Sequence, residues 1–311
     1  MILVCGGVED QVTRFFCDRL KKHGTSFRFL DQQIYPAMYR LRCRWQSNCF
    51  SGSLESKEWH LNFEAVSGVY VRHLRSSQRC AGKLGGAVDD SGVHAENDVG
   101  LESIFAALSC PVANRIGGVV SNESKPYQTL QIMGSSLRIP STLVTNDATE
   151  AEEFYELCTG RVVQKSASGM STGTRQLSRK ELGQLFAERE GPVQLQELVA
   201  GVDLRIHVVG EQIFATRILS KAVDYRFAEQ AGIQVRMEPA NLPPEIAKDC
   251  IRLTEKFGLI FSGIDLKESP DGQFYAFEVN PSPGFILFER ATGQQISMAL
   301  IEFLSTNRQR V

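Results

Sequence analysis

The sequence predicts a mixed α/β fold, with an alternating strand–helix front and a strand-rich back. Residues 1–5 form a short apolar run that ends at a glycine pair, and residues 9–22 then carry apolar side chains at helical spacing. Two more strand-like segments follow at 27–30 and 68–71. These observations predict a small α/β sheet at the front of the chain.

The middle of the chain alternates between helix and strand signals. Residues 75–92 are rich in glycine and serine, which is typical of a surface loop. Beyond them we expect helices at 95–108, 125–133 and 179–189, and strands at 111–114 and 161–165. A domain boundary is expected near residue 118.

The back of the chain predicts an antiparallel sheet, because strand patterns follow one another with glycine turns between them. The strands are expected at 194–199, 204–209 and 212–219. An amphipathic helix at 245–257 and a hairpin turn at 269–272 follow. We therefore expect an N-terminal α/β domain at 1–118, a central subdomain at 119–192 and a C-terminal subdomain at 193–311.

The composition excludes several classes of partner. The chain has 34 Lys and Arg against 36 Asp and Glu, a formal net charge of −2, so it has no overall positive field for nucleic acid. No run reaches the roughly 18 apolar residues of a membrane-spanning helix, and residues 1–12 lack a signal-peptide pattern. The eight dispersed cysteines contain no C-x-x-C pair and suit reduced packing thiols. We expect a cytoplasmic protein that binds neither nucleic acid nor a membrane.

The strongest local signal is a pair of carboxylates that flanks the predicted hairpin turn. A turn at 269–272 puts Asp265 opposite Ala276, and strand alternation then puts Glu278 on the same face as Asp265. Asn280 continues that face, while apolar neighbours, including Phe277, are expected to point into the core. Such oxygen ligands suit Mg²⁺. On spacing alone, solvated strand residues explain the carboxylates equally well.

A second signal is the strand that ends at Lys165, with the small-residue segment 166–173 after it. Small residues let backbone N–H groups approach phosphate oxygens, and lysine adds a positive charge for the same oxygens. Taken alone, such a segment is more often a flexible turn. It is not a Walker loop, because the sequence has no G-x-x-x-x-G-K-[ST] pattern.

Polar residues on the following strands complete the pattern. A strand edge at 196–199 offers backbone groups to an adenine ring, and Asp203 accepts from hydroxyls or orients Arg205. Several cations near these strands suit a triphosphate with its metal ions. They are Arg205, Arg217, Lys221 and Arg226. Taken singly, each is more often an ordinary strand residue or a member of a surface salt bridge.

The ordered set of motifs carries a family resemblance. The motifs are Ser124-Lys125, Ile139-Pro140-Ser141-Thr142, Lys165 with its loop, Gln196-Glu197, Asp203-x-Arg205, Gly263-x-Asp265 and Glu278-x-Asn280-Pro281-Ser282-Pro283-Gly284. Over about residues 114–303 they resemble the ATP-grasp superfamily of carboxylate–amine ligases. The chain is most similar to the branch of the ribosomal-protein glutamate ligase, and it also resembles the ligases that build microviridin-type graspetides. The resemblance implies an ATP-grasp fold with an N-terminal α/β domain, a central lid subdomain and a C-terminal antiparallel-sheet subdomain.

The resemblance also implies roles for individual residues. For ATP these are Lys125 and Lys165 at the phosphates, Gly169 in the closing loop, Glu197, Leu198 and Val199 at the adenine, Asp203 at the ribose, and Arg226 as an anion contact. Arg205 and Arg217 are implied as catalytic cations, with Arg205 stabilising the acyl phosphate. Asp265, Glu278 and Asn280 are implied as ligands of two Mg²⁺ ions, with Mn²⁺ as the alternative ion.

The function that the resemblance implies is an ATP- and Mg²⁺-dependent ligase. A carboxylate is a poor electrophile, so it attacks the γ-phosphate of ATP first, and an amine or hydroxyl then displaces phosphate from the acyl phosphate. The expected substrate is an amino acid, peptide or protein. The alternatives are a graspetide-type macrocyclase that forms side-chain esters or amides, and an ATP-binding module without turnover. The front of the chain and residues 220–238 are expected to select the substrate, and a homo-oligomer is left open.

Overall fold

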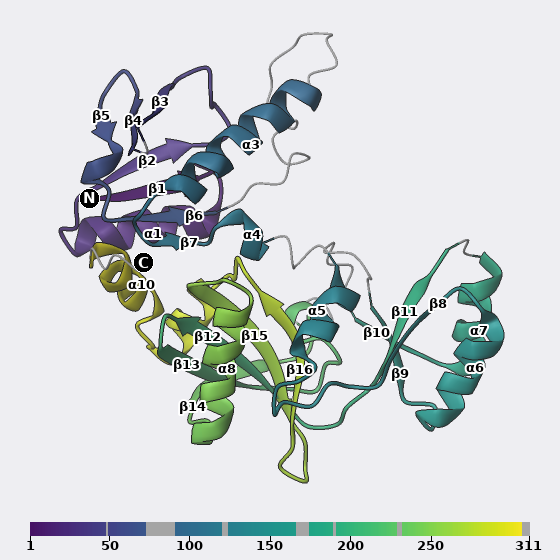
Figure 1. Ribbon diagram of the computed structural model, residues 1–311. Coiled ribbons are helices and arrows are strands. Elements are labelled where there is room, and N and C mark those ends of the chain that lie inside the picture. The colour runs from purple at the N-terminus through teal and green to yellow at the C-terminus, as the bar shows by residue number, and fades with distance from the viewer. Residues whose placement is uncertain are drawn as a thin grey trace.

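The computed structural model describes most of the chain and contains three main sheets (Figure 1). The described residues are 1–47, 49–72, 91–119, 124–165, 174–188, 191–228 and 232–306, with the backbone alone described at 91–98. The predicted surface loop at 75–92 therefore lies almost wholly outside the described residues. Within the described ranges, none of the helices combines the length and the apolar character needed to cross a bilayer.

The N-terminal sheet is parallel, and its strands have the order β2-β1-β6-β7. They are β1 (Ile2–Gly6), β2 (Phe27–Asp31), β6 (Gly68–Val71) and β7 (Val112–Ala113), close to the predicted segments. Helix α1 (Gln11–Lys22) begins where Asp10 accepts a hydrogen bond from the backbone N–H of Thr13. It packs on one face of the sheet, and α3 (Ser91–Ala107) packs on the other.

A second, antiparallel sheet in this part of the chain was not predicted from the sequence. It contains β3 (Arg40–Gln46), β4 (Cys49–Glu55) and β5 (His60–Asn62), and the short helix η1 (Phe63–Ala65) follows it. Its inner face packs Leu54 and Leu61 into the same apolar cluster as Leu101 of α3. The segment was missed because arginines alternate with the apolar residues of β3, which leaves no continuous apolar run.

The central sheet is antiparallel and has the strand order β10-β9-β11-β8. Its strands are β8 (Thr142–Thr145), β9 (Val162–Lys165), β10 (Arg175–Leu177) and β11 (Val193–Glu197). Helices α6 (Ala148–Leu157) and α7 (Arg179–Glu188) pack on one face through Phe154 and Leu182. Because β11 pairs with β8 and β9, this sheet extends past the predicted boundary at residue 192.

The C-terminal sheet is antiparallel, as predicted, with the order β14-β13-β12-β15-β16. Its strands are β12 (Val202–Val209), β13 (Gln212–Ser220), β14 (Val235–Ala240), β15 (Phe261–Glu268) and β16 (Phe274–Asn280). Residues 220–238 are not all loop, because η3 (Tyr225–Phe227) and the start of β14 lie within them. One face of the sheet packs on α8 (Pro244–Lys256) through Leu253.

The N-terminal and C-terminal sheets are joined by shared apolar packing. Helix α10 (Ile296–Ser305) contacts α1, β6 and β12, and α9 (Ile286–Thr292) contacts β14. Buried Asn114, just after β7, donates to the carbonyls of Phe261 and Pro281 at 2.6 Å each. Helices α4 (Ile116–Val119) and α5 (Lys125–Ile132) then lead the chain from the N-terminal sheet to the edge of β16. The residues around Pro281 are thus held from both sheets.

Candidate active site

Asp265 and Glu278 lie directly opposite each other on the neighbouring strands β15 and β16. The predicted pairing of Asp265 with Ala276 was wrong, because Ala276 pairs with Leu266 instead. A β-bulge next to this pair leaves one extra residue, Phe277, on β16 and brings Glu278 opposite Asp265. The two carboxylates therefore share one face of the sheet, as expected, although the register that produces this differs.

Phe277 does not point into the core, which corrects a second expectation. The cluster under α8 contains Ala276 and Val279, but Phe277 is not part of it. Its ring lies 5.0 Å from Nζ of Lys165, which belongs to β9 of the central sheet. An ammonium over an aromatic face is attracted by the ring quadrupole. The bulge thus provides an aromatic contact between the C-terminal sheet and the central sheet.

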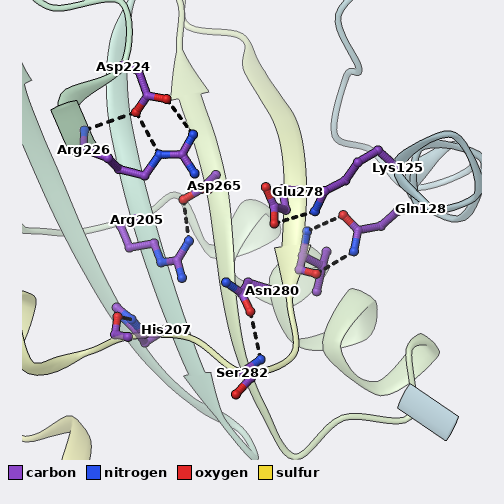
Figure 2. Close-up of polar contacts among 12 residues, drawn as sticks. Lys125, Gln128, Arg205, His207, Asp224, Arg226, Asp265, Glu278, Asn280 and Ser282 are labelled. Carbon is purple, nitrogen blue, oxygen red and sulfur yellow. Dashed lines mark hydrogen bonds and ion pairs between the residues drawn. The ribbon is translucent and has the colours of Figure 1, made fainter. Parts of the chain in front are cut away.

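Arg205 is the buried cation of the site. Its Nη1 donates to Oδ1 of Asp265 at 2.6 Å, and its side chain is only 7% exposed (Figure 2). The strand register places it directly across from Asp265 on β12. Gly263 makes room for it, since a Cβ there would lie 2.2 Å from Nη2 of Arg205. The Nε atom of Arg205 is buried without a hydrogen-bond partner in the described structure.

Two lysines approach the carboxylates from other elements. Lys125, at the start of α5, donates from Nζ to Oε1 of Glu278 at 2.6 Å (Figure 2). Burial raises the pKa of Glu278, but Lys125, Arg205 and Lys165 together lower it by more, so its pKa falls below 4.5. Burial lowers the pKa of Lys165, although the charges of Glu278 and Asp265 oppose this. The site therefore holds alternating charges at close range.

Asn280 ends the row of polar side chains on β16, opposite Gly263. Its Oδ1 accepts a hydrogen bond from the backbone N–H of Ser282 at 2.9 Å, which orients the carboxamide (Figure 2). Arg72, just after β6, donates to the Ser282 hydroxyl at 2.8 Å and also to its carbonyl oxygen. The turn after Asn280 is thus fixed by a cation of the N-terminal sheet.

Asp203 and Arg226, both predicted to contact ATP, each have an ionic partner. Asp203 accepts from Nζ of Lys267 at 3.1 Å, although burial still raises the pKa of its carboxyl. Arg226 forms a two-pronged pair with Asp224, at 2.8 and 2.6 Å. Asp224 also accepts from the backbone N–H of Thr174, at 3.2 Å. Asp224 therefore links the C-terminal subdomain to the residue just before β10.

The predicted adenine segment lies at the end of β11. The backbone N–H of Glu197 donates to the carbonyl of Ser141 at 2.9 Å, and that of Leu198 donates to the carbonyl of Arg161 at 2.8 Å. Val199 is buried, with 8% of its surface exposed. These hydrogen bonds hold the backbone at the end of β11, where the chain leads to the C-terminal sheet. Gly169, predicted in the closing loop, lies outside the described residues.

Arg217 does not join the other predicted residues. It pairs with Leu204 across β12 and β13, and direct cross-strand neighbours share a face. Leu204 packs into the cluster under α8, so Arg217 lies on the face opposite to Asp265. Its Nη2 binds Oε2 of Glu268 at 3.0 Å on that same face. Its predicted catalytic role therefore has no geometric support.

The donor set suits a hard divalent cation. In the ranges that the structure describes, no three His, Cys, Asp or Glu side chains cluster to hold a metal. Two carboxylates and one carboxamide are, however, the kind of set that Mg²⁺ uses when phosphate oxygens and water complete its shell. Asp265, Glu278 and Asn280 occupy neighbouring positions on one sheet face. The residues present therefore fit Mg²⁺ bound together with a nucleotide.

Two supporting residues were not predicted. Gln128 of α5 donates to the carbonyl of Val279 at 2.6 Å and accepts from its N–H at 3.0 Å, so it holds the edge of β16 beside Glu278 (Figure 2). The sequence places Gln128 on an expected helix, but its burial, at 1% exposed, appears only in the structure. The His207 ring is tilted against Phe288, with 5.0 Å between ring centroids, and burial together with the charge of Arg205 lowers its pKa well below 6.5. His207 is therefore a neutral packing residue behind Arg205.

Comparison with known protein families gives one match that covers more than half of the chain. Residues 125–304 match the model of the RimK-like ATP-grasp domain. The matched range contains every residue described above from Lys125 to Asn280. The predicted ATP-grasp resemblance is confirmed.

Among curated proteins, the chain is similar to probable alpha-L-glutamate ligases. It is 26% identical to one from Shewanella denitrificans over 60% of this chain and 66% of that protein. It is 24% identical to one from Pasteurella multocida over 66% of this chain and 67% of that protein. A third, from Picosynechococcus, is 28% identical over 41% of this chain and 43% of that protein. The chain thus spans about two fifths to two thirds of these relatives.

Similar solved structures cover almost the whole chain. Macrocyclase MdnC from Microcystis aeruginosa, bound with the precursor peptide MdnA, has a TM-score of 0.80 at 23% identity, over 98% of this chain and 99% of that one. A RiPP-associated ATP-grasp ligase from Chryseobacterium gregarium has a TM-score of 0.79 at 20% identity, over 100% and 99%. These likenesses establish the fold. The family match over more than half of the chain shows that the chain belongs to the RimK-like ATP-grasp family.

Proposed function

We propose that this protein is an ATP- and Mg²⁺-dependent ligase that joins a carboxylate to an amine or hydroxyl and releases ADP and phosphate. The observation that carries the proposal is the site on one sheet face, where Asp265 and Glu278 stand opposite each other among Arg205, Lys125 and Lys165. Phosphoryl transfer from ATP needs carboxylates that bind metal ions and, beside them, cationic side chains that bind the phosphates.

We assign the nucleotide to the space between the central and C-terminal sheets. Lys125 and Lys165 come from different elements and both act electrostatically on Glu278, so they suit the phosphate oxygens. Residues 197–199 would hold the adenine and Asp203 the ribose. Asp265, Glu278 and Asn280 would hold one or two Mg²⁺ ions, and bound Mg²⁺ neutralises charge on the phosphoryl oxygens. Gly169 and Arg226 remain proposed contacts of the phosphates.

Arg205 is proposed to stabilise the reacting carboxylate as it becomes an acyl phosphate. Its guanidinium is buried, permanently charged and fixed by Asp265, so it needs no rearrangement when negative charge develops beside it. The carboxylate oxygen bonds to the γ-phosphorus as the bond to ADP breaks. The amine or hydroxyl then bonds to the acyl carbon, loses its proton and expels phosphate. We leave Arg217 out of this set because it lies on the other face.

A peptide is the substrate that we favour. The similar structures named as MdnC and the Chryseobacterium ligase were solved with precursor, leader or core peptides, and their likeness extends over the N-terminal sheet as well as the ATP-grasp domain. Structures of another such ligase, PsnB, include one with Mg and ADP. Side-chain cross-linking of a peptide is therefore as good a candidate as the addition of an amino acid. A cytoplasmic location, where ATP is available, remains part of the proposal.

Incubation of the protein with Mg²⁺-ATP, free amino acids and peptides rich in Asp, Glu, Lys, Ser and Thr tests the proposal. We expect ADP and phosphate in a fixed ratio to modified peptide. Loss of one water per link would identify a macrocyclase, and gain of one residue would identify an amino-acid ligase. Release of AMP would contradict the acyl phosphate route. Nucleotide binding without turnover on any peptide would favour the binding-module alternative.

A further inference from the structure

Strand β3 carries three arginines that have no ionic partner among the described residues. Arg40, Arg42 and Arg44 are all exposed, and they alternate with Leu41 and Cys43, which pack toward the core. Alternate residues of a strand lie about 7 Å apart on one face. Glu55 is opposite Arg40 in the register, yet no ion pair joins these two described residues. This row of arginines is called the β3 basic edge below.

Strand β3, which carries the β3 basic edge, is the outermost strand of its sheet. In the part of the chain that the structure describes, β3 pairs with β4 alone, because the sheet order is β3-β4-β5. The other side of its backbone therefore offers N–H and C=O groups in strand geometry. The sheet lies on the N-terminal part of the molecule, away from the helices of the central sheet (Figure 1).

The neighbouring residues leave the arginines room. On the same face of β4, Arg42 and Arg44 lie opposite Ser53 and Ser51, whose side chains are short, and Arg40 lies opposite Glu55. Trp45, near the tip of the hairpin, is 65% exposed and lies against Phe50 at 5.1 Å between ring centroids. The short serine side chains leave the guanidinium groups of Arg42 and Arg44 room to turn toward a strand added at the free edge of β3.

We propose that the β3 basic edge binds an extended acidic peptide segment as an added strand. Main-chain hydrogen bonds to β3 supply affinity, and acidic side chains at alternate positions pair with Arg40, Arg42 and Arg44. This inference rests on the proposed peptide substrate. Charge complementarity favours an acidic occupant. The chain has a net charge of −2 overall, yet β3 carries no acidic residue and three arginines without an ion pair among the described residues.

A peptide fits these features better than a polyanion without backbone amides. A row of arginines alone is compatible with phosphates, but the unpaired strand edge is useful only to a partner that has its own N–H and C=O groups. Charged residues on an edge also prevent aggregation between sheets. Protection against aggregation requires no peptide partner with acidic groups at a particular spacing. Binding measurements therefore distinguish protection against aggregation from peptide binding.

Fluorescence anisotropy without nucleotide tests the inference directly. The probe is a fluorescein-labelled peptide of eight residues that alternates Glu and Thr. We expect saturable binding that weakens as salt rises from low to physiological concentration. A peptide alternating Gln and Thr, and the Glu–Thr peptide with alternate N-methylated amides, should each bind at least about tenfold more weakly, because one lacks the charges and the other the edge hydrogen bonds.

Matched variants locate the binding surface. Charge reversal at the three positions, R40E/R42E/R44E, should weaken binding by about tenfold or more, and the uncharged triple variant R40Q/R42Q/R44Q checks the result if the first variant folds poorly. The control R14E/K21E/K22E makes the same change of charge at exposed positions of α1, on the other side of the N-terminal sheet. It should bind within about twofold of wild type.

The outcomes are distinct from those of the ligase assay. Equal binding by the glutamine triple variant and wild type, or equal binding of the N-methylated peptide, would overturn the inference. So would tighter binding of a single-stranded DNA of equal charge. Binding of the acidic peptide to β3 without turnover of any peptide would support this inference and contradict the proposed function. Turnover of a peptide without binding to β3 would support the proposed function and contradict this inference.

Discussion

The two faces of the C-terminal sheet carry out different tasks within the same strands. The face toward α8 has an apolar centre that contains Leu204, Ile206, Ile264 and Leu266. The intervening positions on β12 and β15 are Asp203, Arg205, Asp265 and Lys267, which pair across the strands on the opposite face. Because side chains alternate along a strand, one set of backbone hydrogen bonds supports both a core and a charged site. Alternate residues of the same strands therefore serve different purposes. One set stabilises the fold, and the other set forms the candidate active site.

The largest expected effect comes from a carboxylate on the charged face. The substitution Glu278→Gln keeps the size of the side chain but removes the charge opposite Asp265. We expect turnover to fall by about a thousandfold, because Glu278 is proposed to hold the Mg²⁺ that stabilises negative charge on the phosphoryl group. The control Glu268→Gln removes a carboxylate from the other face, where its partner is Arg217. Steady-state ADP release should be normal in the control, and equal losses in both variants would break the distinction.

The apolar face should respond in stability and not in chemistry. Leu266 is 1% exposed in the cluster under α8, so Leu266→Ala leaves a cavity there. We expect the free energy of unfolding to fall by about 2–5 kcal/mol. Urea denaturation measures this, while the apparent KM for ATP below the unfolding range should stay near that of wild type. A raised KM for ATP with an unchanged free energy of unfolding would contradict the claim that this face stabilises the fold and takes no part in ATP binding.

Gly263 tests whether Arg205 needs its present position. An added Cβ at residue 263 would lie 2.2 Å from Nη2 of Arg205, so Gly263→Ala forces the guanidinium away from Asp265. We expect a cost of about 1–3 kcal/mol in unfolding free energy, typical of overpacking, together with a lower turnover number. Gly284→Ala is the matched control, since a Cβ there has no neighbour within 4 Å. Identical thermal unfolding of Gly263→Ala and wild type would show that the contact is dispensable.

The smallest effect is expected at Arg217. Its pair with Glu268 is partly exposed, at 36% and 31%, so Arg217→Leu should change the unfolding free energy by less than about 1 kcal/mol. Its ATP turnover should stay within about twofold of wild type, because the residue lies on the core-side face. A loss of turnover comparable to that of Glu278→Gln would restore the catalytic role that the sequence resemblance implied.

Much of the site was predictable from strand alternation and motif order. The shared face of Asp265 and Glu278 followed from alternation, but the bulge at Phe277 did not, because no turn or glycine signal marks it. The position of Arg217 was open to prediction: the two-residue turn at 210–211 fixes Val209 opposite Gln212, and counting back gives Leu204 opposite Arg217. Gly169 stays a prediction.

The N-terminal part was predicted less completely. The parallel strands are short apolar runs, and these are easily recognised. Strand β3 alternates arginine with apolar residues and ends near an exposed tryptophan, so its pattern is typical of a half-exposed strand rather than of a core strand. Its pairing with β4 depends on tertiary packing against α3, which no local pattern encodes.

Calorimetric titration of a non-hydrolysable ATP analogue, with and without Mg²⁺, tests the central claim most directly. Asp265 and Glu278 are proposed to hold Mg²⁺ against the nucleotide, so Mg²⁺ should tighten nucleotide binding in wild type and in Glu268→Gln. It should have little effect in Glu278→Gln. If Mg²⁺ tightened binding equally in Glu278→Gln and wild type, the assignment of the metal to this face would be wrong.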